Sequence, residues 1–224
     1  MEMYHVMSRG VDKRDIFMDD KDRARFIHDL FEFNDEQSAN NTSYRFKNND
    51  IVSRYIAKRE PRKLLVNVLA FCLMPNHYHL LLTPRFDNSV SKFMKKLNIG
   101  YAKYFNERYK RKGTLFEGRY KSIIVKNESH FIHLPYYIHL NPLDLKYKEW
   151  RDRKLQSVKG AMKFLDSYRW SSHLDYCGEH NFPSVTQRDF LMRVFDSPER
   201  YRQRIKDWLS ELDLSDVKGF TLEN

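Results

Sequence analysis

Cysteine is scarce in this sequence, and the motifs that cysteine usually builds are missing. Cys72 and Cys177 are the two cysteines among 224 residues, and no C-x-x-C pair occurs. This argues against a thiolate zinc site and against a disulfide framework, and it is typical of a reducing cytosolic compartment.

Long apolar segments are missing as well. No stretch is long and apolar enough to cross a bilayer, and the N-terminus lacks the charged-then-apolar pattern of a signal peptide. The sequence also contains no internal repeat. We therefore expect a soluble intracellular protein without a membrane partner.

The charge is strongly basic. Lys and Arg number 40 against 30 Asp and Glu, which gives a net charge of +10, and aromatic residues make up 15% of the chain. Cations that follow a phosphate backbone and rings that stack on bases are what a single-stranded nucleic-acid binder needs. A basic protein without such a partner would have the same composition. The length favours one domain with appendages over two equal domains.

The chain is organised around residues 64–84, LLVNVLAFCLMPNHYHLLLTP. Two apolar runs flank a Pro-Asn turn, which predicts two neighbouring buried strands in a hairpin. Side chains alternate between the two faces of a strand, so His77 and His79 should share a face while Tyr78 points away.

Two interpretations of this histidine pair remain open from the residues alone. Their backbones stand about 7 Å apart, which suits chelation of one divalent metal by two imidazoles. They could equally be histidines with satisfied hydrogen bonds on a solvated sheet face. A metal site would need a third ligand from another part of the chain.

Other elements follow from hydrophobic periodicity and from capping residues. We expect a strand at 4–9, a helix opened by the aspartates at 19–22, an exposed polar loop at 34–50, a short helix near 51–59, an amphipathic helix at 88–110, a strand at 120–125, and two closing helices at 187–196 and 198–212. His5 lies on the first strand, where we assign it a structural or DNA-facing role rather than that of a ligand.

A basic segment surrounds the glycines at 113 and 118. Cations, glycines and aromatic residues occur together there, which favours contact with nucleic acid over a solvated face. The candidate contact residues are Arg119 and Lys121, with Lys110, Arg111 and Lys112 before them.

A helical segment is expected at 128–141, ESHFIHLPYYIHLN. His133, Tyr137 and Asn141 follow one another at four-residue steps, so we expect them on one face of the helix. Pro135 lacks an N–H and clashes with the preceding turn, so the helix should either kink or begin there.

The order of these motifs resembles that of the REP-associated tyrosine transposases. The residues that carry the resemblance are LMPNHYHLLL, GTLFEGRYKSI, YIHLNP and WSSHLDY, from about Tyr4 to Gly178 and excluding the polar insert. That family belongs to the HUH class of single-strand transposases, which is named for a His-hydrophobic-His motif and uses a single nucleophilic tyrosine.

The resemblance implies an α+β, ferredoxin-like (RRM-like) fold with an antiparallel sheet and helices packed on one face. Residues 1–178 would form the transposase domain, interrupted by a polar insert at about 34–63, and residues 179–224 would form a C-terminal helical extension. The implied activity is cleavage and transfer of single-stranded DNA at or near hairpin or palindromic repeats. The reaction would leave a 5′-phosphotyrosine and a free 3′-OH.

The resemblance also assigns roles to individual residues. His77 and His79 match the metal ligands, Tyr137 matches the nucleophile, and Asn141 matches the polar ligand that completes the metal site. Mg²⁺ or Mn²⁺ is the implied ion. His133 remains an alternative third ligand or base, as does His139. Tyr136 is turned by about 100° from Tyr137 along a helix, so it should not share a face with Asn141.

Other functions fit parts of the same pattern. A non-catalytic nucleic-acid-binding module could use the ferredoxin-like sheet, and a relaxase or replication initiator would share the chemistry but usually has a longer chain. The expected partner is single-stranded or hairpin DNA, bound by a monomer or a homodimer in a prokaryotic cytoplasm, associated with the nucleoid.

Overall fold

The computed structural model describes residues 2–37, 44–47, 50–53, 61–125, 128–152, 154–211 and 222. Its centre is a four-stranded sheet in the order β4-β5-β1-β6, with every neighbouring pair antiparallel. The strands are β1 (Met3–Arg9), β4 (Val66–Met74), β5 (His77–Pro84) and β6 (Lys121–Val125). With the helices between them they form the β-α-β-β-α-β arrangement of a ferredoxin-like fold, as predicted.

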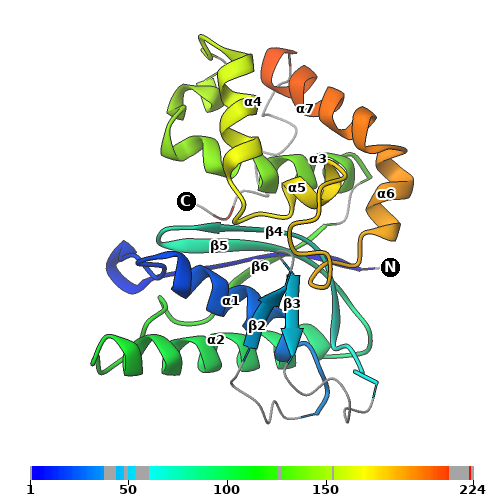
Figure 1. Ribbon diagram of the computed structural model, residues 1–224. Helices are drawn as coiled ribbons and strands as arrows, with labels where there is room; N and C mark the ends of the chain where they lie inside the picture. Colours follow the sequence, from blue (N-terminus) through cyan, green and yellow to red (C-terminus); the bar gives the residue numbers. More distant parts are fainter. Residues whose placement is uncertain are drawn as a thin grey trace.

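Two helices cover one face of this sheet (Figure 1). They are α1 (Asp20–Glu32), which begins where the Asp19 side chain accepts two backbone N–H groups, and α2 (Ser89–Arg108). Phe26 of α1 and Phe93 of α2 are fully buried in the same cluster as Tyr78 of β5, and the Phe26 and Tyr78 ring centroids are 4.6 Å apart. Tyr78 therefore points into this layer, on the face opposite to its two histidine neighbours.

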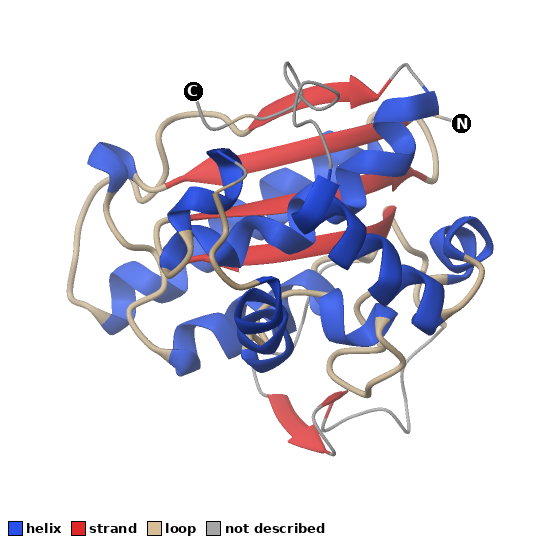
Figure 2. Ribbon diagram, turned by 90° about the horizontal axis from the view of Figure 1, so that it is seen from above, coloured by secondary structure: helices blue, strands red, loops and turns tan. Residues whose placement is uncertain are grey.

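The other face is covered too, by α3 and the C-terminal helices (Figures 1 and 2). The elements are α3 (Glu128–Leu140), the 3-10 turns η3 (Asn141–Leu145) and η4 (Lys148–Asp152), α4 (Val158–Ser167), α5 (His173–Tyr176), α6 (Asp189–Phe195) and α7 (Pro198–Glu211). We predicted α6 and α7 but not α4, although Val158, Ala161, Met162 and Leu165 have helical spacing. Pro135 lies inside α3, which continues on both sides of it.

The C-terminal part also pairs with the outer edge of the sheet. β4 is an edge strand, and its outward N–H groups donate to the Gln187 Oε1 (2.7 Å, from Val68), to the Ser172 Oγ (2.9 Å, from Phe71) and to the Trp170 carbonyl (2.9 Å, from Leu73). Unpaired edge N–H groups would otherwise invite pairing with another chain. The residues after Pro142 thus complete the sheet as well as covering it.

The polar insert differs from our expectation in the parts that the structure describes. Tyr44–Lys47 (β2) and Asp50–Ser53 (β3) form an antiparallel two-stranded sheet. The prediction of a loop up to residue 50 and of a helix from 51 was wrong there, because β-branched and alternating aromatic residues favour strands. The rest of the predicted short helix, 54–59, lies outside the described residues.

Asn34, which we placed in the exposed insert, is buried and fixes the start of β4. Its Oδ1 accepts the N–H groups of Leu65 (3.0 Å) and Val66 (2.9 Å), and its Nδ2 donates to the Val66 carbonyl (2.9 Å). The Asn34 side chain thus makes the hydrogen bonds to the β4 backbone that a neighbouring strand would otherwise make.

Asn34→Ala is expected to lower the free energy of unfolding by about 3 kcal/mol, because it leaves buried backbone groups without hydrogen bonds. Urea unfolding would show a lower midpoint with an unchanged slope. Gln37→Ala, at an exposed position close by, should leave the midpoint where it is. A shift in the control as large as that of Asn34→Ala would contradict the assignment.

Among the described helices, none is long and apolar enough to cross a membrane.

Candidate active site

His77 and His79 lie on β5 and face the layer that contains α3. Their ring centroids are 5.0 Å apart, as the alternation of a strand predicts. His79 is completely buried, whereas His77, at the start of the strand, is partly exposed. The Nδ1 atom of His77 lies 2.6 Å from the Asn76 Oδ1.

His5, for which we predicted a structural or DNA-facing role, is completely buried beside this pair. The register of β1 against β5 sets His5 opposite Leu81, two residues from His79 on the same face. The His5 Nε2 lies 2.9 Å from the His79 Nδ1, and the two rings stack with centroids 5.1 Å apart. In the tautomer in which His79 Nδ1–H donates to His5, the His79 Nε2 is the unprotonated nitrogen.

Tyr137 lies in the last turn of α3, and Asn141 is the first residue of η3. Both belong to the layer that covers this face of the sheet. The Tyr137 ring is completely buried, with its centroid 6.3 Å from that of His79 and 6.4 Å from that of His5. Asn141 lies four residues later, and its Nδ2 donates to the Tyr137 carbonyl at 3.0 Å. Two segments far apart in the sequence thus meet here.

Arg151 of η4 connects the tyrosine to the asparagine. Its Nη1 donates to the Tyr137 hydroxyl oxygen at 3.1 Å, and its Nη2 donates to the Asn141 Oδ1 at 3.0 Å. Asp144 holds the guanidinium through an Nη2–Oδ2 ion pair of 2.5 Å and an Nε–Oδ1 bond of 2.8 Å. Nothing in our reading of the sequence pointed to Arg151, which lies in the charged connection after Pro142.

The electrostatic surroundings keep His79 neutral. Burial, together with the positive charges of Arg151 and Arg9, lowers the pKa of this histidine to about 3. Arg9 lies on the same face of β1, opposite His77. A neutral imidazole is the form that binds a metal, and the nearby cations favour an anionic ligand such as phosphate.

Three other residues considered from the sequence lie elsewhere. The His133 ring is 5.2 Å from that of Trp208 on α7, which is also 5.8 Å from the ring of Tyr136. His133 and Tyr136 therefore share a side of α3 that faces the C-terminal helix. His139 is completely buried between the Ser172 Oγ (2.7 Å) and the Tyr201 hydroxyl (2.8 Å).

The basic segment after α2 lies beside the histidine end of the sheet. The Val11 N–H donates to the Leu115 carbonyl, and the Glu117 N–H donates to the Arg9 carbonyl, each at 2.9 Å. The side chains of Lys110, Lys112, Arg119 and Lys121 are exposed, while that of Arg111 is partly buried over the Phe105 ring. Lys121 pairs with Met7, and Met7 pairs with His79, so the three residues form one row on the same face.

Comparison with known proteins identifies the family of this chain. Residues 3–141 match the family model described as "Transposase IS200 like". A solved structure of a REP-associated tyrosine transposase bound to a REP hairpin is similar at 11% identity and a TM-score of 0.44, covering 84% of this chain and 85% of that one. Curated protein sequences give no match. The match to the family model spans more than half of the 224 residues. The chain belongs to the family of IS200-like transposases.

Proposed function

We propose that this protein is a metal-dependent endonuclease and strand transferase that cleaves single-stranded DNA at or near hairpin or palindromic repeats, in the cytoplasm of a prokaryote. The observation that carries the proposal is the position of the Tyr137 ring, 6.3 Å from that of His79, with Arg151 bonded to both the Tyr137 hydroxyl and the Asn141 side chain. A module that only binds nucleic acid has no need of that set. We propose that the protein acts on this DNA as a monomer or a homodimer.

The residues fit a divalent ion such as Mg²⁺ or Mn²⁺. His77 and His79 offer two neutral imidazoles, and the Asn141 amide oxygen offers a third donor, which together leave coordination positions open for phosphate and water. The ion would stabilise negative charge on the phosphate and on the leaving oxygen. The His5–His79 hydrogen bond supports this use, because a hydrogen-bond partner on one ring nitrogen of a histidine orients the other nitrogen toward a metal.

The reaction assigns Tyr137 the role of nucleophile. Its hydroxyl oxygen attacks phosphorus, the bond from phosphorus to the 3′ oxygen breaks, and the proton lost by the phenol is balanced by one gained at the 3′ oxygen. The products are a 5′-phosphotyrosine and a free 3′-OH. Since the new phosphodiester keeps the bond energy, a second 3′-OH can attack it and rejoin the strands without ATP.

Arg119 and Lys121, with Lys110, Arg111 and Lys112, are the residues that we propose to contact the DNA backbone. Lys121 has the strongest structural support, because it stands two strands away from His79 in the same row, about 10 Å across the sheet. A single strand whose phosphate lies between the histidines and Tyr137 would pass within reach of this lysine.

Lys121→Gln is expected to weaken binding of a DNA hairpin several-fold and to reduce the slope of log affinity against log salt by about 1, as the loss of one phosphate contact does. Fluorescence anisotropy over a range of salt concentrations measures both quantities. Lys95→Gln is the matched control, because Lys95 is exposed on α2, which covers the other face of the sheet. Equal losses in the two variants would contradict a specific contact.

The function is tested by incubating the protein with end-labelled single-stranded hairpins and Mn²⁺, and by resolving the products on a denaturing gel. We expect an SDS-resistant DNA adduct together with a fragment that ends in a 3′-OH, and neither should form when EDTA is present. Tight hairpin binding without any adduct would favour the binding-module alternative instead.

A further inference from the structure

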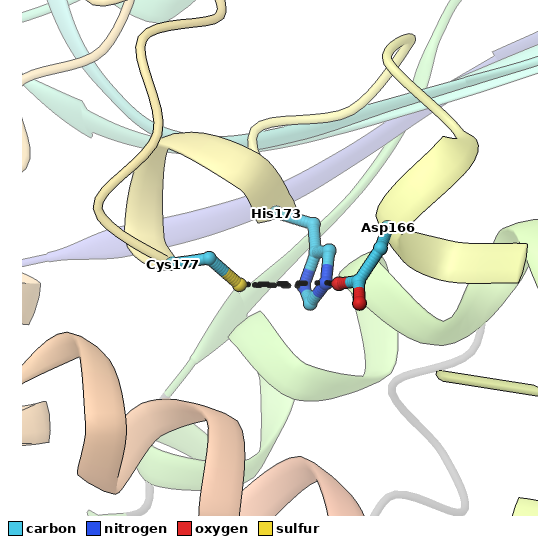
Figure 3. Close-up of side chains that lie close together, drawn as sticks. All are labelled: Asp166, His173 and Cys177. Atoms are coloured by element: carbon cyan, nitrogen blue, oxygen red, sulfur yellow. Dashed lines mark hydrogen bonds and ion pairs between the residues drawn. The ribbon is translucent and has the colours of Figure 1, made fainter. Parts of the chain in front are cut away.

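A second group of metal-binding side chains lies among the C-terminal helices, and none of them belongs to the proposed active site. Asp166 comes from the end of α4, His173 begins α5, and Cys177 follows α5 directly. Figure 3 shows His173 between the other two side chains. The His173 Nε2 is 3.4 Å from the Asp166 Oδ1 and 3.5 Å from the Cys177 Sγ, and the three ligand atoms all lie within 4.8 Å of one another.

These separations match the edges of a tetrahedral metal site. With Zn–S near 2.3 Å and Zn–N and Zn–O slightly above 2.0 Å, a tetrahedron sets its nitrogen and sulfur about 3.6 Å apart and its nitrogen and oxygen about 3.4 Å apart. An N–H···O hydrogen bond would usually be shorter, about 2.9 Å. Both the Asp166 Oδ1 and the Cys177 Sγ lie nearest to the His173 Nε2, although the Sγ is also 3.9 Å from the Nδ1, whereas in a Cys-His-Asp triad the two ring nitrogens have separate partners.

We propose that Asp166, His173 and Cys177 bind Zn²⁺ or a similar borderline transition-metal ion. One imidazole, one thiolate and one carboxylate form a ligand set that such ions accept, and Mg²⁺ does not prefer it. The Asp166 side chain is 32% exposed, which leaves a path from solvent and room for water as a fourth ligand. The sequence did not indicate this site, because the site contains a single cysteine and therefore no C-x-x-C pair.

The other nitrogen of His173 has the partner that a metal-bound histidine needs. The Tyr201 hydroxyl lies 2.9 Å from the His173 Nδ1 and 2.8 Å from the His139 Nδ1. Its single hydrogen can go to His139 while it accepts the Nδ1–H of His173, and His139 then donates its Nε2–H to the Ser172 Oγ at 2.7 Å. Every hydrogen bond of Tyr201 and His139 is satisfied in this tautomer, and the His173 Nε2 is left unprotonated, 3.4 Å from the Asp166 Oδ1 and 3.5 Å from the Cys177 Sγ.

The charges around the site also suit a divalent ion. Arg202 binds the Asp166 Oδ2 and the Glu179 Oε1, each at 3.1 Å, so the Asp166 Oδ1 faces His173 while the guanidinium orients the carboxylate. Two carboxylates and a thiolate together balance one guanidinium and one divalent ion. The ion would tie α4 to α5 and, through Tyr201 and His139, would hold α7 against α3, the helix that carries Tyr137.

Cobalt tests the proposal directly, because a thiolate bound to Co²⁺ gives an intense charge-transfer absorption that nitrogen and oxygen ligands do not give. The full chain, stripped with chelator and titrated with Co²⁺, should develop this band to one equivalent. Zn²⁺ should remove the band. Cys177→Ser should lose it, and Asp166→Asn should need a higher Co²⁺ concentration to form it.

Two controls separate this site from others. Cys72→Ala removes the other cysteine, and His77→Ala removes a proposed ligand of the active site; both should keep the band. Tyr201→Phe should weaken the affinity about 10-fold or more while preserving the packing of the ring. The proposal is overturned if the wild-type chain gives no band, or if the band persists in Cys177→Ser.

Discussion

Tyr137→Phe is expected to abolish the covalent DNA adduct and to reduce strand cleavage by about 10⁴-fold or more, because no other group can take the place of a covalent nucleophile. The substitution keeps the aromatic ring, whose centroid lies 6.4 Å from that of His5, 6.3 Å from that of His79 and 6.5 Å from that of Trp150. Hairpin affinity and thermal stability should therefore stay close to those of the wild type. Single-turnover cleavage and an SDS gel measure the loss.

Tyr136→Phe is the matched control, one residue earlier on the same helix. The Tyr136 ring packs against Phe195, Tyr201 and Trp208, at centroid distances of 5.1, 5.6 and 5.8 Å, on the side of α3 that faces the C-terminal helices. We expect this variant to form the adduct at close to the normal rate. An adduct that disappears in Tyr136→Phe and persists in Tyr137→Phe would reverse the assignment.

The positions of His77 and His79 could be predicted because they depend on local geometry. A buried strand alternates its side chains, so the shared face of the pair follows from their spacing alone. Their 5.0 Å ring separation agrees with that reasoning. The order of strands and helices in the ferredoxin-like core followed equally from periodicity and from turn signals.

The contact of His5 with His79 and the position of Arg151 were not predicted because both depend on contacts between distant segments. His5 reaches His79 only through the antiparallel register of β1 against β5, which a single sequence does not give. Arg151 reaches Tyr137 through two short 3-10 turns without hydrophobic periodicity. In the same way, four-residue spacing predicted that His133 shares a face of the helix with Tyr137. In the structure the His133 ring instead lies 5.2 Å from the ring of Trp208 on α7.

The C-terminal helices show a further limit of local patterns. α6 and α7 were predicted as an extension, yet Phe195 and Tyr201 share a core with Leu134 and Tyr136 of α3. A helix pattern gives the apolar face of a helix but not its partner. We therefore expect the helix that carries Tyr137 to depend on α7 for its position, so residues far from the chemistry contribute to the proposed active site.

Arg151→Met is expected to slow cleavage by about 10²- to 10³-fold, the usual effect of removing one donor that stabilises developing negative charge. Its guanidinium donates to the Tyr137 hydroxyl oxygen, where charge must appear before the attack on phosphorus. Arg151→Lys keeps the positive charge, but its single ammonium cannot bond Tyr137 and Asn141 together as the two guanidinium nitrogens do. Its cleavage rate should therefore fall between those of the wild type and of Arg151→Met. Single-turnover rates at saturating DNA separate this effect from binding.

Arg151→Met, which is expected to slow cleavage, should nevertheless bind the metal ion more tightly. The Arg151 Nη2 donates a hydrogen bond of 3.0 Å to the Asn141 Oδ1, which is the oxygen that we propose as a metal ligand. A cation beside that oxygen opposes a second cation, so Arg151→Met should require less Mn²⁺ for half-maximal cleavage even though its maximal rate is lower. Asp144→Asn, which weakens the ion pair that holds the guanidinium, should disturb both quantities less. A variant that lost both rate and Mn²⁺ affinity would mean that Arg151 supports the metal site instead of competing for Asn141.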